Sequence, residues 1–263
     1  LVRSRGLGDV YKRQDEHGVH RRGNRQDPDG LHAKNAAGGI ECIMKKSTKI
    51  AFFGDSVTEG CFEIYPCSYG FETVKRPEDG YAVKTIKALR QKHGELSFEY
   101  ENFAKRGYSA HTARSQLGTL MLSAADIAVL CFGLNDALHP EERFGTALAD
   151  MFAKLKSTIP TVVFMTPNMM NTYLHPQTLP CARKVAEKTM AAQTDGKFDR
   201  MMERAKLLCT ENGIVLCDAY AHWKAMYASG IDTTELLVNR INHPTAEMHD
   251  VFAQMLTNVL EGI

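Results

Sequence analysis

The chain has 263 residues, 44% of them apolar, which is enough for one α/β domain with a sizeable core. Its 32 basic and 31 acidic residues leave a net charge of +1, so no strong field is present to attract nucleic acid or an anionic membrane. No apolar run approaches the ~18–20 residues that a membrane span needs. Seven scattered cysteines argue against a disulfide framework and favour a reducing, cytoplasmic setting.

Residues 1–43 differ from the rest of the chain. They are rich in Gly, Arg, Asp and His and show no sustained period of 2 or 3.6 residues. Such a segment cannot bury enough apolar surface to offset its ordering entropy. We therefore expect residues 1–43 to be a disordered tail or a non-native extension, with a genuine N-terminal arm as the alternative, and residues 44–263 to form the domain.

From residue 47 onward, short apolar runs alternate with amphipathic segments. The runs predict five strands, at Lys49–Phe53, Phe98–Phe103, Asp126–Phe132, Thr161–Thr166 and Ile214–Cys217. Helical spacing of apolar residues predicts helices at Tyr81–His93, Phe144–Leu155 and Thr245–Leu260. Strands that alternate with helices indicate βαβ units, and so an α/β fold in which a parallel sheet is covered on both faces. In such folds the chemistry lies at the carboxyl ends of the strands.

Two candidate residues follow the first two predicted strands. Ser56 lies in the turn GDSVTEG, where a serine between strand and helix exposes its hydroxyl and its own N–H. Taken alone, this serine is more often a helix cap or a turn residue. Gly107 lies after the second strand and brings a bare backbone N–H close to a ligand, although a plain turn glycine is the stronger interpretation in isolation.

Two further candidates lie after the third strand and before the last helix. Asn135, in the sequence GLND, can aim its amide at a developing oxyanion, or it can simply form an Asx-turn. His243 precedes Pro244, which keeps the histidine out of the helical region at the mouth of a loop. A lone histidine at such a place is usually a surface residue.

Together, the four segments resemble the SGNH (GDSL) hydrolase family over about residues 47–260. Ser56, Gly107, Asn135 and His243 match the four signature residues of that family, in the same order and with similar surrounding blocks. The resemblance implies a three-layer α/β/α fold with a parallel, flavodoxin-like, five-stranded sheet. It also implies a serine esterase: Ser56 attacks the ester carbonyl, His243 accepts and returns the proton, and the oxyanion is held by the N–H groups of Ser56 and Gly107 and by the Asn135 amide.

The sequence departs from the family at one position. An aspartate usually stands three residues before the histidine, and here that position is Arg240, with Asn239 before it. We therefore expect a Ser–His dyad in which a neutral acceptor, such as a backbone carbonyl, orients His243, and in which Arg240→Asp or Asn239→Asp raises turnover if the loop tolerates it. Asp218 is a more distant candidate for the acid, but a helix cap is the likelier role for it.

Two insertions bear on the substrate. Residues 61–79 are predicted to form a long loop with four aromatic residues, Phe62, Tyr65, Tyr69 and Phe71. Residues 167–180 are expected to border the same cleft with Asn168, Met169, Met170, Asn171 and Tyr173. Aromatic residues mixed with asparagines favour a sugar-like or mixed polar acceptor, although a plain lid fits equally well. We expect short-chain O-acyl esters as substrates, among them small-molecule esters and acylated carbohydrates. An acyltransferase and a binding module with a degenerate site are the alternatives, and the sequence shows no metal-ligand spacing or cofactor motif.

Overall fold

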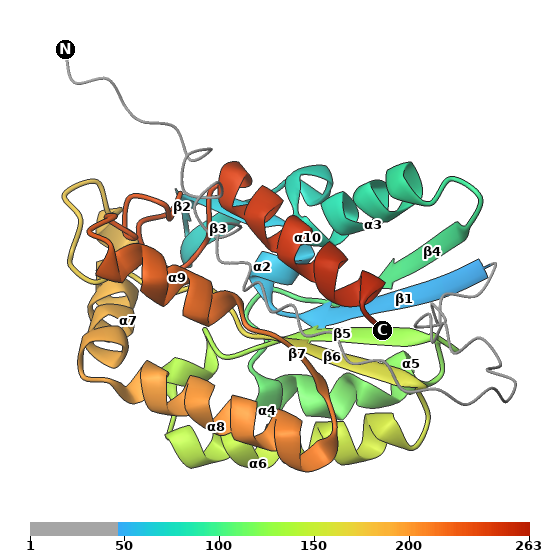
Figure 1. The fold of residues 1–263 in the computed structure, drawn as a ribbon. Coiled ribbons are helices and arrows are strands. Elements are labelled where there is room, and N and C mark those ends of the chain that lie inside the picture. The colour runs from blue at the N-terminus through green and yellow to red at the C-terminus, as the bar shows by residue number, and fades with distance from the viewer. Residues whose placement is uncertain (1–46) are drawn as a thin grey trace, which may run out of the picture. The chain divides into compact units, whose positions relative to one another are not determined.

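The computed structural model describes residues 47–263, so the predicted tail at 1–43 lies outside the described residues. Its centre is a sheet of five parallel strands in the order β4-β1-β5-β6-β7 (Figure 1). The strands are β1 (Ser47–Gly54), β4 (Ser97–Asn102), β5 (Ile127–Cys131), β6 (Thr161–Met165) and β7 (Val215–Cys217). This is the flavodoxin-like strand order, and the predicted fold class is confirmed.

Two pairs of helices cover the two faces of this sheet (Figure 1). α3 (Tyr81–Lys92) and α10 (Ala246–Glu261) pack together on one face, and α6 (Glu141–Lys156) and α8 (Lys197–Asn212) pack together on the other. Every residue of β5 is buried, because this central strand has a helical layer on each side. In α10, the apolar stripe that faces the sheet repeats every four residues, at Met248, Phe252, Leu256 and Leu260.

Shorter elements occupy the connections between strands and helices. The remaining helices are α2 (Ser56–Glu59), α4 (Ala110–Ala113), α5 (Leu117–Met121), α7 (Arg183–Thr194) and α9 (Ala219–Ala228), with 3₁₀ turns η1 (Pro77–Asp79), η2 (Arg114–Gln116), η3 (Asp136–Leu138) and η4 (Pro180–Ala182). Within residues 47–263, no helix combines the length and apolarity that crossing a bilayer requires.

The prediction of a long loop at 61–79 was wrong. These residues form an antiparallel hairpin of β2 (Cys61–Cys67) and β3 (Gly70–Lys75), followed by η1. The segment is rich in aromatic and β-branched residues, which favour strands, and Gly70 adopts a φ of +125° at the tight turn. Ile64 and Phe71 pack against a small apolar cluster of Ala182, Ala186 and Ile241, of which Ile241 lies in the loop that carries His243. The hairpin is therefore an ordered wall beside that loop.

Candidate active site

The turn that carries Ser56 is built by the end of β1 and the start of α2. Gly54 ends the strand where a Cβ would lie 2.8 Å from the Cys131 carbonyl oxygen, so only glycine fits there. Asp55 caps α2 by accepting a hydrogen bond of 3.0 Å from the Val57 N–H. Ser56 is the first residue of the helix and is buried, with 6% of its surface exposed. The turn thus presents the serine hydroxyl from a fixed backbone.

His243 joins Ser56 to the hairpin. The Ser56 Oγ lies 2.9 Å from the His243 Nε2, and the His243 Nδ1 lies 2.6 Å from the backbone carbonyl oxygen of Phe62. A carbonyl only accepts, so Nδ1 carries the proton and Nε2 is left as the acceptor for the serine hydroxyl. Among the described residues, no carboxylate hydrogen-bonds to either ring nitrogen. A backbone carbonyl on β2 therefore occupies the place for which the sequence predicted a neutral acceptor.

The two residues at the expected aspartate position have other partners. The Asn239 Oδ1 accepts three backbone hydrogen bonds, from Ile241 at 3.0 Å, Asn242 at 2.9 Å and His243 at 2.9 Å. Asn239 therefore shapes the loop that carries the histidine but does not touch the imidazole. Arg240 adopts a φ of +59°, which is uncommon outside glycine.

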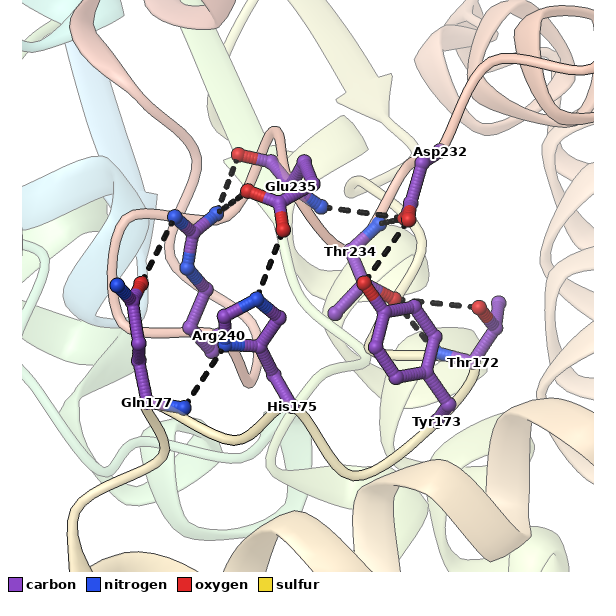
Figure 2. A network of polar contacts seen from close by, with 8 residues as sticks. All are labelled: Thr172, Tyr173, His175, Gln177, Asp232, Thr234, Glu235 and Arg240. Carbon is purple, nitrogen blue, oxygen red and sulfur yellow. Dashed lines mark hydrogen bonds and ion pairs between the residues drawn. The ribbon is translucent and has the colours of Figure 1, made fainter.

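Figure 2 shows the Arg240 side chain within a polar network. Its Nη1 lies 2.7 Å from both the backbone carbonyl oxygen and the Oε2 of Glu235. The Nε2 of His175 lies 2.7 Å from the Glu235 Oε1, and the Tyr173 hydroxyl donates to the Asp232 Oδ2 at 2.8 Å. The network ties residues 172–177 to residues 232–240.

Residues 167–180 therefore support the loop that carries His243 through hydrogen bonds. The Asn168 Nδ2 donates to the Asn242 carbonyl oxygen at 2.9 Å, and the Asn171 N–H donates to the Ile241 carbonyl oxygen at 2.9 Å. None of the described residues that line the cavity at Ser56 comes from this segment. The expectation that it borders the cleft was wrong, because its side chains are used to hold the loop.

Gly107 and Asn135 lie on two loops that hydrogen-bond to each other. Gly107 has a φ of +78° in the loop after β4. The Asn135 Nδ2 donates to the Tyr108 carbonyl oxygen at 2.9 Å, and the Ala110 N–H donates to the Asp136 Oδ2 at 3.0 Å. Burial raises the pKa of Asp136 to about 6. The relative position of the two candidate oxyanion donors is thus fixed by side chains of the GLND turn.

All four residues singled out from the sequence line one cavity of about 310 Å³. Its lining residues are Ser56, Tyr69, Phe71, Glu72, Arg106, Gly107, Asn135, Val185, Asn239, Ile241, Asn242 and His243. Glu72 on β3 forms an ion pair with Arg106, beside Gly107, and accepts a hydrogen bond of 2.7 Å from the Tyr69 hydroxyl. The sequence did not identify Phe62, Glu72 and Arg106 as residues of the candidate site. The pairing of the hairpin strands is the signal that could have placed Phe62 and Glu72 there.

Two titratable groups at the site have shifted pKa values. Burial lowers the pKa of His243, while the Phe62 carbonyl and the charge of Glu63 raise it in part, so the neutral imidazole is the form present near neutral pH. Burial also raises the pKa of Asp55 to about 7. Both shifts follow from the exclusion of water by the surrounding loops.

Asp218 has a structural role. Its Oδ1 caps α9 by accepting a hydrogen bond of 3.1 Å from the Ala221 N–H, and Oδ2 pairs with the Lys206 Nζ at 2.8 Å. The part of the chain from 47 to 263 contains no group of three or more His, Cys, Asp or Glu side chains that could hold a metal ion.

Fold and site together define a class of proteins. A serine at the end of the first strand, a histidine before the last helix and two loop residues line one cavity of a three-layer α/β/α fold, an arrangement that could support nucleophilic acyl transfer. The model of the GDSL-like lipase/acylhydrolase family matches residues 52–251. The chain belongs to this family. None of the curated proteins compared with it matches the sequence.

Solved structures share the fold at low sequence identity. LAE5, an alpha/beta hydrolase enzyme from the metagenome of Lake Arreo, is 17% identical and has a TM-score of 0.61, covering 81% of this chain and 94% of its own. Axe2, an acetylxylan esterase from Geobacillus stearothermophilus, is 16% identical with a TM-score of 0.61, covering 82% and 96%. A catalytic mutant of Axe2 that replaces an aspartate is 17% identical with a TM-score of 0.60, covering 81% and 94%.

Proposed function

We propose that the chain is a serine esterase that hydrolyses short O-acyl esters, with Ser56 as nucleophile and His243 as general base. The observation that carries the proposal is the continuous hydrogen-bonded line from the Ser56 hydroxyl through His243 to the Phe62 carbonyl. Nucleophile and base lie within hydrogen-bond reach, and the base is oriented by a third group, as nucleophilic catalysis requires. Membership of an acylhydrolase family supports the same class of reaction.

The reaction follows from this geometry. As the Ser56 Oγ attacks the ester carbonyl carbon, its proton passes to the His243 Nε2, and the carbonyl oxygen becomes an oxyanion. The N–H groups of Ser56 and Gly107 and the Asn135 amide stabilise that oxyanion. The imidazolium then protonates the departing alcohol, which leaves an acyl-enzyme on Ser56. Water, deprotonated by His243, attacks the acyl-enzyme and releases the acid.

The orienting group distinguishes this site from that of Axe2, in which an aspartate is a catalytic residue. A carbonyl oxygen holds the Nδ1 proton and fixes the tautomer as a carboxylate does. It bears no full negative charge, so it stabilises the imidazolium less. A working Ser–His dyad, slower than a complete triad, is the form that this site supports.

The cavity supports a small acyl group on a polar alcohol. Its volume is about 310 Å³, and three asparagines, a tyrosine and the Glu72–Arg106 pair lie in its wall beside Phe71, Val185 and Ile241. The apolar side chains in a cavity of this volume suit an acetyl-like acyl group, and the polar side chains suit a hydroxylated leaving group. Axe2, with the same fold, is an acetylxylan esterase. Acetylated carbohydrates are therefore the substrates to test first.

A fluorophosphonate probe and a chain-length series of p-nitrophenyl esters test this function. We expect the probe to label the wild-type protein and not Ser56→Ala, and we expect hydrolysis to be fastest for acetyl or propionyl esters. Acetylated sugars should be cleaved in the same assay, with free acetate as the readout. Hydrolysis by Ser56→Ala at the wild-type rate would overturn the assignment. Labelling without hydrolysis, but with acyl transfer to an added alcohol, would identify an acyltransferase instead.

A further inference from the structure

The Phe62 ring lies between one cationic side chain and one aromatic side chain. The ring is fully buried, with the Arg76 guanidinium carbon 4.3 Å from its centroid and the His249 ring centroid at 4.8 Å. Contacts between tilted aromatic rings and cation–π contacts restrict the position and orientation of such a ring. Because the carbonyl oxygen of the same residue accepts the His243 Nδ1 proton, whatever holds Phe62 also holds the general base.

Arg76 is in turn fixed by two carboxylates from the same hairpin and turn. Its Nη1 and Nη2 bind the two carboxylate oxygens of Glu63 at 2.5 and 3.1 Å, in the bidentate geometry that guanidinium and carboxylate favour. Its Nε binds the Asp79 Oδ2 at 3.1 Å. Glu63 directly follows Phe62 on β2, whereas Asp79 lies on η1. Arg76 therefore has two carboxylate partners, of which only Glu63 is adjacent to the orienting carbonyl.

The charged and titratable groups around His243 come from several parts of the chain. Glu63 and Arg76 lie on the hairpin side, Glu72 and Arg106 at the cavity, and His249 on α10. Burial lowers the pKa of His249 to about 3, so this ring is neutral at working pH. Hydrogen bonds from Arg76 lower the pKa of Glu63, which is therefore anionic. Among these groups, Glu63 is the one whose negative charge favours the imidazolium form of His243.

We propose that Glu63 is a positioning residue of the esterase: with Arg76 it fixes the Phe62 carbonyl against His243, and its carboxylate supplies the negative charge that an aspartate supplies in a complete triad. The carboxylate does not touch the imidazole but acts one residue away, through the peptide carbonyl and through space. The inference rests on the proposed function, because it concerns the base of that reaction. It assigns a catalytic purpose to the hairpin inserted directly after the nucleophile.

Glu63→Gln and Asp79→Asn form a matched pair of variants for testing this role. Each removes one negative charge and one carboxylate partner of Arg76, and each substitute keeps an amide oxygen that can accept from the guanidinium. Only Glu63→Gln removes the charge next to the Phe62 carbonyl. A purely structural role of the ion pairs predicts similar effects of the two variants. Glu63→Asp, which keeps the charge, serves as the rescue variant.

Two readouts on the full chain decide the matter. In a histidine-ring NMR titration, with the His243 signal assigned from its loss in His243→Ala, we expect Glu63→Gln to lower the pKa of His243. Asp79→Asn should leave it unchanged, and Glu63→Asp should restore it towards the wild-type value. In ester hydrolysis, Glu63→Gln should reduce kcat about 3-fold to about 10-fold with KM unchanged, and the acid limb of the kcat/KM profile should move to lower pH.

The NMR readout does not depend on hydrolysis, so it separates this inference from the proposed function. If Glu63→Gln and Asp79→Asn leave the pKa of His243 equally unchanged, or shift it equally, the role of Glu63 is refuted even when Ser56 and His243 are essential for hydrolysis. If the pKa of His243 responds as expected but no ester is hydrolysed, the proposed function is wrong, and the catalytic role of Glu63 is refuted as well. A loss of melting temperature shared by the two variants, with no difference in kcat or pKa, would reduce the pair to a structural role.

Discussion

The two halves of the cavity are held in place by different means. Ser56, Gly107 and Asn135 follow β1, β4 and β5, and hydrogen bonds from Asn135 and to Asp136 join the loop that carries Gly107 to the loop that carries Asn135. His243 lies on a loop before α10, and its ring is oriented by a hairpin that is not part of the central sheet. We call Ser56, Gly107 and Asn135 the nucleophile half and the His243 loop the histidine half. The nucleophile half is thus positioned by the central sheet, and the histidine half depends on the inserted hairpin.

Each half also contains a carboxyl group with a shifted pKa, and the two pKa values are shifted in opposite directions. Asp55, beside the nucleophile, is buried, its Oδ2 has no hydrogen-bond partner, and its pKa is raised to about 7 by burial. Glu63, beside the carbonyl that orients the base, is partly exposed and its pKa is lowered by hydrogen bonds from Arg76. Water exclusion governs the first group and ion pairing governs the second. Substitutions in the two halves should therefore have different signatures.

Among substitutions that leave Ser56 and His243 in place, the largest effect is expected in the nucleophile half. Asn135→Ala removes the amide that we propose as an oxyanion donor and should lower kcat about 10²-fold to 10³-fold, with a small change in KM. Asn135→Asp is the matched control, since it keeps the shape but replaces the donor by an acceptor, and it should be at least as damaging. Steady-state kinetics on p-nitrophenyl acetate provide the measurement. An unchanged kcat in Asn135→Ala would remove this residue from the oxyanion site.

Asp55→Asn should change how stability depends on pH. A carboxyl whose folded pKa lies above its ordinary value stabilises the fold below about pH 4, and this contribution is lost as pH rises to about 7. Asparagine keeps the helix cap and does not titrate. From pH 4 to 7 the free energy of unfolding of the variant should therefore rise relative to wild type, by about 4 kcal/mol at most, and level off above. Urea unfolding across this range checks it, and a constant difference would contradict the raised pKa.

Asn239→Ala should affect the histidine half through its backbone. The substitution removes an acceptor for three N–H groups, two of them buried, so we expect a loss of about 1–3 kcal/mol in stability. Turnover should fall about tenfold, because the loop no longer holds His243 at its hydrogen-bonding distance. The sequence suggested that Asn239→Asp raises turnover, but the side chain at this position accepts from the loop backbone and not from the imidazole. Asn239→Asp keeps the acceptor, so we now expect it to behave close to wild type in both thermal melting and kcat. Equal damage by both substitutions would show that the side-chain amide matters instead.

The smallest effect is expected at position 240, where the structure changes an earlier expectation. The sequence suggested that Arg240→Asp raises turnover, but the side chain at this position faces Glu235, and the His243 Nδ1 already binds the Phe62 carbonyl. We now expect kcat to stay within about threefold of wild type and stability to fall by about 1 kcal/mol through repulsion between the two carboxylates. A clear gain in kcat would show that the loop rearranges to bring an acid to the histidine.

The sheet and the nucleophile half could be predicted from the sequence, because short buried runs mark parallel strands and chemistry follows their carboxyl ends. The histidine half was predicted only in part. Pro244 indicated a loop residue, but the partner of Nδ1 is a backbone carbonyl, and a backbone group leaves no trace in residue type. Pro66 interrupts the strand pattern within residues 61–79, and the hairpin pairing, which is irregular between Cys61 and Ile64, is not visible in the sequence. The hairpin forms through long-range packing, which the local sequence pattern does not reveal.

The central claim is that His243, oriented by a carbonyl and not by a residue at 239 or 240, is the base of Ser56. The most direct test compares kcat for His243→Ala and Arg240→Ala with wild type on one activated ester at the pH optimum. The account predicts a loss of about 10³-fold or more for His243→Ala and a change within about threefold for Arg240→Ala. Equal losses at 240 and 243, or no loss in His243→Ala, would contradict it.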